Sequence, residues 1–121
     1  PAKNPIYLYA RAGEPIAFAG LWDLWRAPDG AEVASCTIVT TESNAIVKPI
    51  HDRMPLVLPP ERYAAWLDPA LADAARLVEW LRQTPAADLE AYSVSRAVNS
   101  PDNDGPACIV PAPPEQGSLF R

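Results

Sequence analysis

Short runs of apolar and β-branched residues, separated by turn signals, dominate the first half of the chain. The runs occupy residues 6–10, 15–25, 37–41 and 54–58. This pattern is typical of strands, and we expect all four to be largely buried. Residues 11–14 form a short connection with a glycine, which predicts a hairpin between the first two runs. Residues 26–30 read as a turn before a further strand that begins at about Val33.

Helical spacing of apolar residues appears between residues 59 and 83. Pro59 and Pro60 open a short helix that runs through Trp66, because proline is tolerated in a first helical turn. Asp68 followed by Pro69 predicts an N-cap and the start of a second helix that ends near Gln83. Its apolar positions share one side, so we expect it to pack on a sheet. Residues 89–95 then predict one more strand.

These elements predict an α/β fold that is mostly β, with two short packed helices in a single domain, residues 1–110. The chain has 121 residues, enough for one hydrophobic core but not for two. Its 15 prolines favour a body rich in loops. Residues 111–121 have the composition of an extended, flexible tail.

Charge and cysteine content narrow the class of protein. A net charge of −5 argues against a general nucleic-acid coat, although a few cations on one face can still form a phosphate-binding groove. No apolar run approaches membrane-spanning length and no signal peptide is visible, so we expect a cytoplasmic protein without a membrane partner. Cys36 and Cys108 lack the spacing of a zinc site. We therefore expect two reduced, buried thiols and neither a metal nor a cofactor.

The only histidine, His51, lies in the connection that enters the run at residues 54–58. A histidine titrates near neutral pH, and Arg53 offers a rigid fork for a phosphate. Threonine hydroxyls at the end of the preceding strand can donate to an oxyanion. Together they indicate acid/base chemistry beside an anionic substrate. The alternative is structural: His51 caps a turn and Arg53 pairs with Asp52 or Glu42.

Several blocks of this sequence resemble the SOS response-associated peptidase family. They are Phe-Ala-Gly-Leu-Trp at 18–22, residues 36–44, Ile-His-Asp-Arg-Met-Pro at 50–55, Trp-Leu-Asp at 66–68, and Val-Ser with Val-Asn at 94–99. The block at 50–55 is the most specific. The resemblance extends from about Asn4 to Pro111, in the order and spacing of the family.

The resemblance implies a function in the DNA damage response. Members of this family recognise abasic sites in single-stranded DNA and form a protective covalent crosslink to them through a terminal cysteine, with lyase and self-cleaving peptidase activity. It implies that His51 is the active-site acid/base, that Arg53 contacts a DNA phosphate, and that Thr40 contacts the sugar. The family's nucleophilic cysteine, an asparagine and a glutamate would lie before Pro1. Neither Cys36 nor Cys108 can replace a terminal cysteine, because thiazolidine closure uses the α-amine and thiol of one residue.

We therefore expect this chain to be the C-terminal part of such a domain, without its N-terminal strands and inactive in crosslinking by itself. Exposed sheet edges would then favour self-association or pairing with the N-terminal part. Two alternatives remain: a non-catalytic module that binds single-stranded DNA, and a structural half-domain that needs a partner segment. Trp22 and Trp25 could stack on bases, although we expect at least one of them in the core.

The end of the chain carries a second resemblance. Gln116-Gly117-Ser118-Leu119-Phe120 is similar to the short motif with which bacterial replication and repair proteins bind the sliding clamp. Leu119 and Phe120 would fill an apolar pocket, and Gln116 would hydrogen-bond at its edge. The alternative is a tail whose two apolar residues have no partner.

Overall fold

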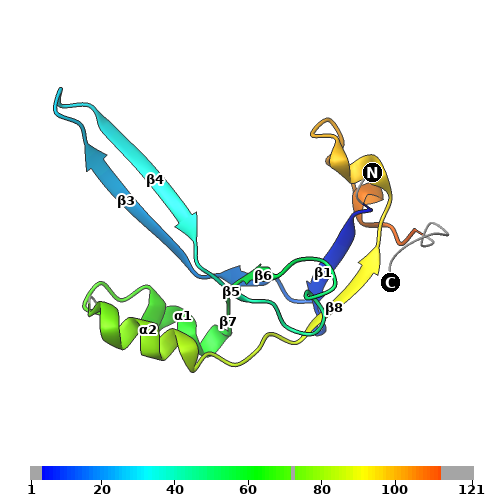
Figure 1. Ribbon diagram of the computed structural model, residues 1–121. Coiled ribbons are helices and arrows are strands. Elements are labelled where there is room, and N and C mark those ends of the chain that lie inside the picture. The colour runs from blue at the N-terminus through cyan, green and yellow to red at the C-terminus, as the bar shows by residue number, and fades with distance from the viewer. Residues whose placement is uncertain (1–3, 72, 113–121) are drawn as a thin grey trace. The chain divides into compact units, whose positions relative to one another are not determined.

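The computed structural model describes residues 4–71 and 73–112 (Figure 1). The chain divides into two compact units, one built from the two ends of the chain and the other from Pro15–Asp88. Strands in two-stranded antiparallel sheets make up most of the regular structure, with short helices between them. The predicted class, α/β with mostly β structure, is confirmed.

Three small sheets form the centre of the unit Pro15–Asp88. They are β2 (Ala17–Phe18) with β7 (Val57–Leu58), β3 (Gly20–Arg26) with β4 (Glu32–Ile38), and β5 (Thr40–Glu42) with β6 (Arg53–Pro55). Single residues separate consecutive strands at Ala19, Val39 and Leu56. Their backbones close a ring, because Ala19 N donates to Leu56 O (2.9 Å), Leu56 N to Val39 O (2.9 Å) and Val39 N to Ala19 O (2.8 Å). The predicted strands at 37–41 and 54–58 are therefore interrupted where the chain changes its pairing partner.

The hydrophobic core lies at this three-way junction. Ala19 is fully buried, Leu58 is 3% exposed, and Leu56 completes the cluster. The 3-10 turn η1 (Pro60–Arg62) leads into α1 (Tyr63–Trp66), as the two prolines predicted. Trp80 and Leu81 of α2 (Ala74–Arg82) pack against the cluster, so the expected packing of this helix on a sheet is confirmed.

The predicted start of the second helix is wrong. The helix begins at Ala74, and Asp73 is its N-cap, with a carboxylate that accepts from Ala75 N (2.9 Å) and Arg76 N (3.2 Å). Asp68 caps only a local turn, through Ala70 N at 2.9 Å. Two aspartates five positions apart offer the same capping chemistry, and the later one begins the helix.

The predicted hairpin between the first two runs is also wrong. Strand β1 (Ile6–Ala10) pairs with β8 (Leu89–Ser93), far along the chain. The rings of Tyr7 and Tyr9 lie 5.4 and 5.6 Å from the ring of Tyr92, and the Tyr9 hydroxyl donates to Glu90, a bond that raises the pKa of Tyr9. These long-range side-chain contacts favour β8 over the nearer strand.

The unit built from the two ends of the chain also contains two 3-10 helices, η2 (Arg96–Asn99) and η3 (Pro106–Ile109). The predicted strand at 89–95 stops at Ser93, because Ser95 caps η2 by accepting from Ala97 N at 3.2 Å.

Strands β3 and β4 form a long hairpin whose turn was predicted correctly. Gly30 has φ 87° and donates to Ala27 O at 2.9 Å. The predicted burial of residues 15–25 and 37–41 is wrong for β3 and for the end of β4, because every residue of both seven-residue strands is exposed. Trp22 and Trp25 are both exposed. The expectation that at least one of them lies in the core is therefore wrong.

The two cysteines differ in their surroundings. Cys108 is a buried free thiol, as expected, whereas Cys36 is free but exposed on β4, which contradicts the prediction of burial. Within residues 4–71 and 73–112, no group of three or more His, Cys, Asp or Glu side chains could hold a metal ion. In the same residues, no helix has the length and apolar character needed to cross a bilayer.

Candidate functional site

An ordered loop, residues 43–52, carries the histidine between β5 and β6. The side chain of Asn44 organises its first turn: Oδ1 accepts from Ile46 N (3.1 Å) and Val47 N (3.0 Å). Its Nδ2 donates to Ala87 O at 3.5 Å. This is the capping geometry that asparagine offers at the start of a helical turn. Asn44 therefore ties the loop both to itself and to the segment after α2.

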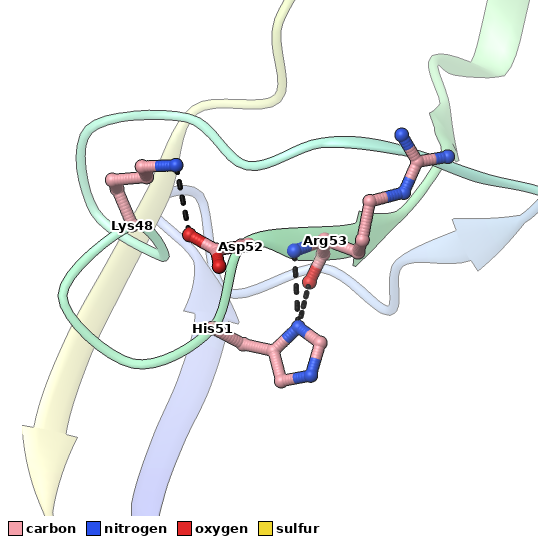
Figure 2. Close-up of polar contacts among 4 residues, drawn as sticks. All are labelled: Lys48, His51, Asp52 and Arg53. Carbon is pink, nitrogen blue, oxygen red and sulfur yellow. Dashed lines mark hydrogen bonds and ion pairs between the residues drawn. The ribbon is translucent and has the colours of Figure 1, made fainter.

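The second half of the loop fixes the backbone of the histidine. Val47 is buried, and His51 N donates to Val47 O at 2.9 Å. Ser43 N donates to Asp52 O at 3.1 Å and closes the loop at its base. The carboxylate of Asp52 pairs with Lys48 Nζ at 2.8 Å (Figure 2). Both partners are exposed, so the pair adds little stability, but it neutralises the carboxylate beside the histidine.

Replacing Asn44 by alanine is expected to loosen this loop. The loss of a capping side chain costs about 1 kcal/mol, and the amides of Ile46 and Val47 should exchange with solvent several-fold faster, as measured by hydrogen exchange. Asn44→Asp is the matched control, because it keeps the accepting oxygen and should leave both amides near the original rate. Equal exchange in the two variants would show that the side chain does not hold the loop.

The imidazole of His51 is held by the backbone of Arg53. Its Nδ1 lies 3.0 Å from Arg53 N and 2.9 Å from Arg53 O (Figure 2). In one neutral tautomer, Nδ1 accepts the Arg53 N–H and Nε2 carries the proton. In the other, Nδ1–H donates to the Arg53 carbonyl and Nε2 presents a lone pair. Each tautomer thus keeps a backbone hydrogen bond.

The second ring nitrogen remains available. Figure 2 shows Nε2 on the ring edge that faces away from Arg53, and it has no hydrogen-bond partner among the residues that the structure describes. The side chain is exposed. Because Nδ1 has a partner in either tautomer, Nε2 can give or take a proton without loss of the ring's orientation.

The guanidinium of Arg53 is anchored at one nitrogen. Nη2 donates to the backbone oxygen of Thr40 (2.8 Å) and to its Oγ1 (3.0 Å). Glu42 lies directly opposite Arg53 in the sheet, yet the arginine bonds to Thr40, and Asp52 pairs with Lys48. The pairing of Arg53 with Asp52 or Glu42 in the structural alternative is therefore wrong, whereas the local turn closed by His51 is present.

Thr40 and Arg53 leave further donors exposed. The other guanidinium N–H groups have no partner in the described part of the chain, and the Thr40 hydroxyl, which accepts from Arg53, can still donate its own proton. The cationic guanidinium and the neighbouring hydroxyl are donors suited to an anionic oxygen.

A pocket of about 290 Å³ lies beside the β5–β6 sheet. Thr41 and Met54 are paired across the two strands and line it, together with Leu81 from α2. Since side chains alternate between the faces of a strand, Thr40 and Arg53 point to the other side. The residues that line the pocket include Asn44 of the loop but none of His51, Arg53 and Thr40.

The structure brings together the three residues singled out in the body of the chain, His51, Arg53 and Thr40. The three tail residues, Gln116, Leu119 and Phe120, lie outside the described residues. Sequence reasoning missed the role of Asn44. The signal was an asparagine directly before an apolar turn, Ala-Ile-Val at 45–47, a common sequence for a capped turn.

Comparison with known proteins gives consistent results. Residues 1–101 match the profile of the SOS response associated peptidase (SRAP) family. The abasic site processing protein YoqW of Bacillus subtilis is 41% identical over 107 residues, which are 88% of this chain and 48% of that protein. The abasic site processing protein HMCES of Gallus gallus is 37% identical over 98 residues, 79% of this chain and 29% of that protein.

Solved structures agree with these matches. An X-ray structure of a protein from Bacteroides thetaiotaomicron superimposes with a TM-score of 0.73 and 28% identity, over 92% of this chain and 49% of that one. The chain thus spans about half the length of YoqW and of this structural neighbour. On the profile match and the identity to YoqW, the chain belongs to the SRAP family.

Proposed function

We propose that this chain supplies the histidine and arginine of a site that processes abasic sites in single-stranded DNA. Relatives that bear the name abasic site processing protein support this substrate. The observation that carries the proposal is that the entry to β6 presents two groups two residues apart, an unpaired Nε2 on His51 and an exposed guanidinium on Arg53 that Thr40 anchors. A proton-transfer group and a phosphate-binding fork carried by the same short segment suit chemistry on a sugar within a nucleic-acid backbone.

The proposed chemistry concerns the ring-opened sugar of the abasic site. That sugar is an aldehyde, and an amine condenses with it to an imine through steps that each move a proton. His51 acts as the acid/base in these steps, since Nε2 changes between donor and acceptor while Nδ1 stays bonded to the Arg53 backbone. A crosslink that protects the lesion, and the strand cleavage that competes with it, both depend on such transfers.

Arg53 has a positioning role. Its unpaired N–H groups hold the phosphate next to the abasic sugar, and the bonds from Nη2 to Thr40 fix the guanidinium for this contact. The Thr40 hydroxyl donates to an oxygen of the same sugar-phosphate unit. With a net charge of −5, the chain relies on a few local contacts and not on a general basic surface.

The test uses a chimera in which this chain replaces the matched 107 residues of YoqW. We expect it to form an adduct with single-stranded DNA that contains an abasic site, stable on a denaturing gel, and none with intact DNA. A polypeptide of these 121 residues should form no such adduct by itself. The resemblance implies that the nucleophile is a terminal cysteine, and the first residue of this polypeptide is Pro1. A chimera that folds by circular dichroism but forms no adduct would refute the proposal.

Arg53→Ala is expected to weaken single-stranded DNA binding about equally for all sequences. One lost phosphate contact should reduce the slope of log K against log salt by about 0.7. Fluorescence titrations of the 121-residue chain at several salt concentrations measure it. Arg82→Ala is the control, because this arginine is an exposed residue in the last turn of α2, and it should leave the slope unchanged. An unaltered slope in the Arg53 variant would leave this arginine with only its structural bonds to Thr40.

A further inference from the structure

The hairpin β3–β4 has no neighbouring strand in the described structure. The two strands pair only with each other, in a register that joins Gly20 to Ile38 and Arg26 to Glu32 (Figure 1). Their outer edges therefore carry backbone N–H and C=O groups that no third strand satisfies. An isolated two-stranded hairpin is marginally stable in water, so such a hairpin ordinarily packs on something else.

One face of the hairpin is continuously apolar. Residues that lie opposite each other in the register share a face, and this one, the Trp22 face, consists of Gly20, Trp22, Leu24, Ala34, Cys36 and Ile38. The side chains are exposed: Trp22 by 78%, Leu24 by 41% and Ile38 by 51%. The ion pair between Arg26 and Glu32, at 2.8 Å, ends the face on the turn side. The opposite face is mixed, because Asp23 and Ser35 lie between its apolar residues.

The apolar surface continues beyond the hairpin. A groove of about 380 Å³ is lined by Phe18, Leu58, Trp66 and Leu67, and Gly20 belongs both to this groove and to the Trp22 face. Leu67 and Phe18 are exposed there. Trp66 Nε1 donates to Gly20 O at 3.2 Å, which holds α1 against the start of the hairpin. The face and the groove therefore form one apolar strip.

The charge of the hairpin disfavours nucleic acid as the occupant. Three carboxylates, Asp23, Asp29 and Glu32, lie on it or in its turn, against the single cation Arg26. Stacking of bases on tryptophans works together with a positively charged path for the backbone, and this surface has none. The strip instead matches an apolar polypeptide.

We propose that the Trp22 face is the docking surface for a strand-forming segment of the SRAP fold that lies outside these 121 residues. The solved neighbour contains this chain's fold within 49% of its length, and YoqW within 48%, so about half of each relative is available to cover the strip. A third strand would satisfy the free hairpin edge through backbone hydrogen bonds, and its side chains would bury Trp22, Leu24 and Ile38. This inference is independent of the proposed function.

The experiment mixes the full chain with the part of YoqW outside the matched 107 residues, expressed as a separate polypeptide. Hydrogen exchange should slow at least about tenfold across residues 20–38, and tryptophan fluorescence should shift to shorter wavelength. Trp22→Ser should weaken binding about tenfold or more. Trp25→Ser, the same change on the opposite face, should weaken it less than about threefold. Circular dichroism checks that both variants keep their fold.

Four other results would each contradict the proposal. Equal losses in the two variants would remove the Trp22 face as the docking surface. Protection of residues 20–38 that appears without the YoqW polypeptide, and disappears on dilution, would make a second copy of this chain the occupant. Protection by single-stranded DNA would assign the hairpin to nucleic acid. If exchange in the unsubstituted chain stays unchanged with the YoqW polypeptide, the strip does not bind this half of the fold.

Discussion

His51→Gln in the YoqW chimera is expected to slow adduct reversal and strand cleavage at abasic DNA by about a hundredfold or more. General acid/base groups contribute about 10²–10⁴-fold, and glutamine cannot transfer a proton at the position of Nε2. Glutamine can still accept a hydrogen bond, so the turn that Nδ1 forms with Arg53 has a substitute partner. Single-turnover rates on a labelled oligonucleotide measure the effect.

DNA affinity is the readout that separates chemistry from structure. A stable analogue that lacks the aldehyde binds without reaction, and its dissociation constant should change less than about threefold in the glutamine variant. His51→Ala removes both the proton transfer and the hydrogen bond to Arg53, so it should add a loss of binding to the same loss of rate. If binding and rate fall in parallel in the glutamine variant, His51 serves only to close the turn before β6.

Local chemistry explains which parts of the structure could be predicted from the sequence. A glycine at positive φ follows from the turn at residues 26–30, and two prolines predict η1 and α1. The proximity of His51 and Arg53 follows from their spacing of two at the entry to a strand. In each case the residues that decide the conformation are neighbours in the chain.

Pairing between distant segments could not be predicted in this way. Strand β1 pairs with β8, about eighty residues further along the chain, and nothing in the turn at Gly13 indicates this pairing. The three-way junction is equally non-local, because the breaks at Ala19, Val39 and Leu56 make sense only when all three backbones are brought together. Apolar content predicted burial for β3, whereas every residue of this strand is exposed in the structure.

The anchoring of Arg53 shows a third limit. Sequence spacing offered two carboxylates as partners, Asp52 and Glu42, and the structure uses neither. Lys48 neutralises Asp52 because the helical turn of the loop brings these side chains, four residues apart in the sequence, close together. Thr40 then receives the guanidinium through two oxygens. The other N–H groups of the arginine have no partner in the described part of the chain, an outcome that depends on loop geometry more than on the order of charges.

Leu58→Ala is expected to cause the largest loss of stability of any single change considered in this chain. Leu58 is 3% exposed and belongs to the cluster of Ala19 and Leu56 at the three-way junction. Truncation of a buried leucine costs about 2–5 kcal/mol, through lost transfer energy and the cavity left behind. A chain of this size has a total stability of only about 5–15 kcal/mol, so the midpoint of urea unfolding should fall steeply.

Leu67→Ala provides the matched control for this change. Leu67 lies on the adjacent groove and is 76% exposed, so the same truncation should alter the free energy of unfolding by less than about 0.5 kcal/mol. Urea titrations of both variants, followed by far-UV circular dichroism, compare the two residues directly. Because Leu58 pairs with Ala17 and lies two residues from the backbone ring at Leu56, its loss should open β2 and β7 together. Equal midpoints for the two variants would mean that the junction is not the core that holds Pro15–Asp88 together.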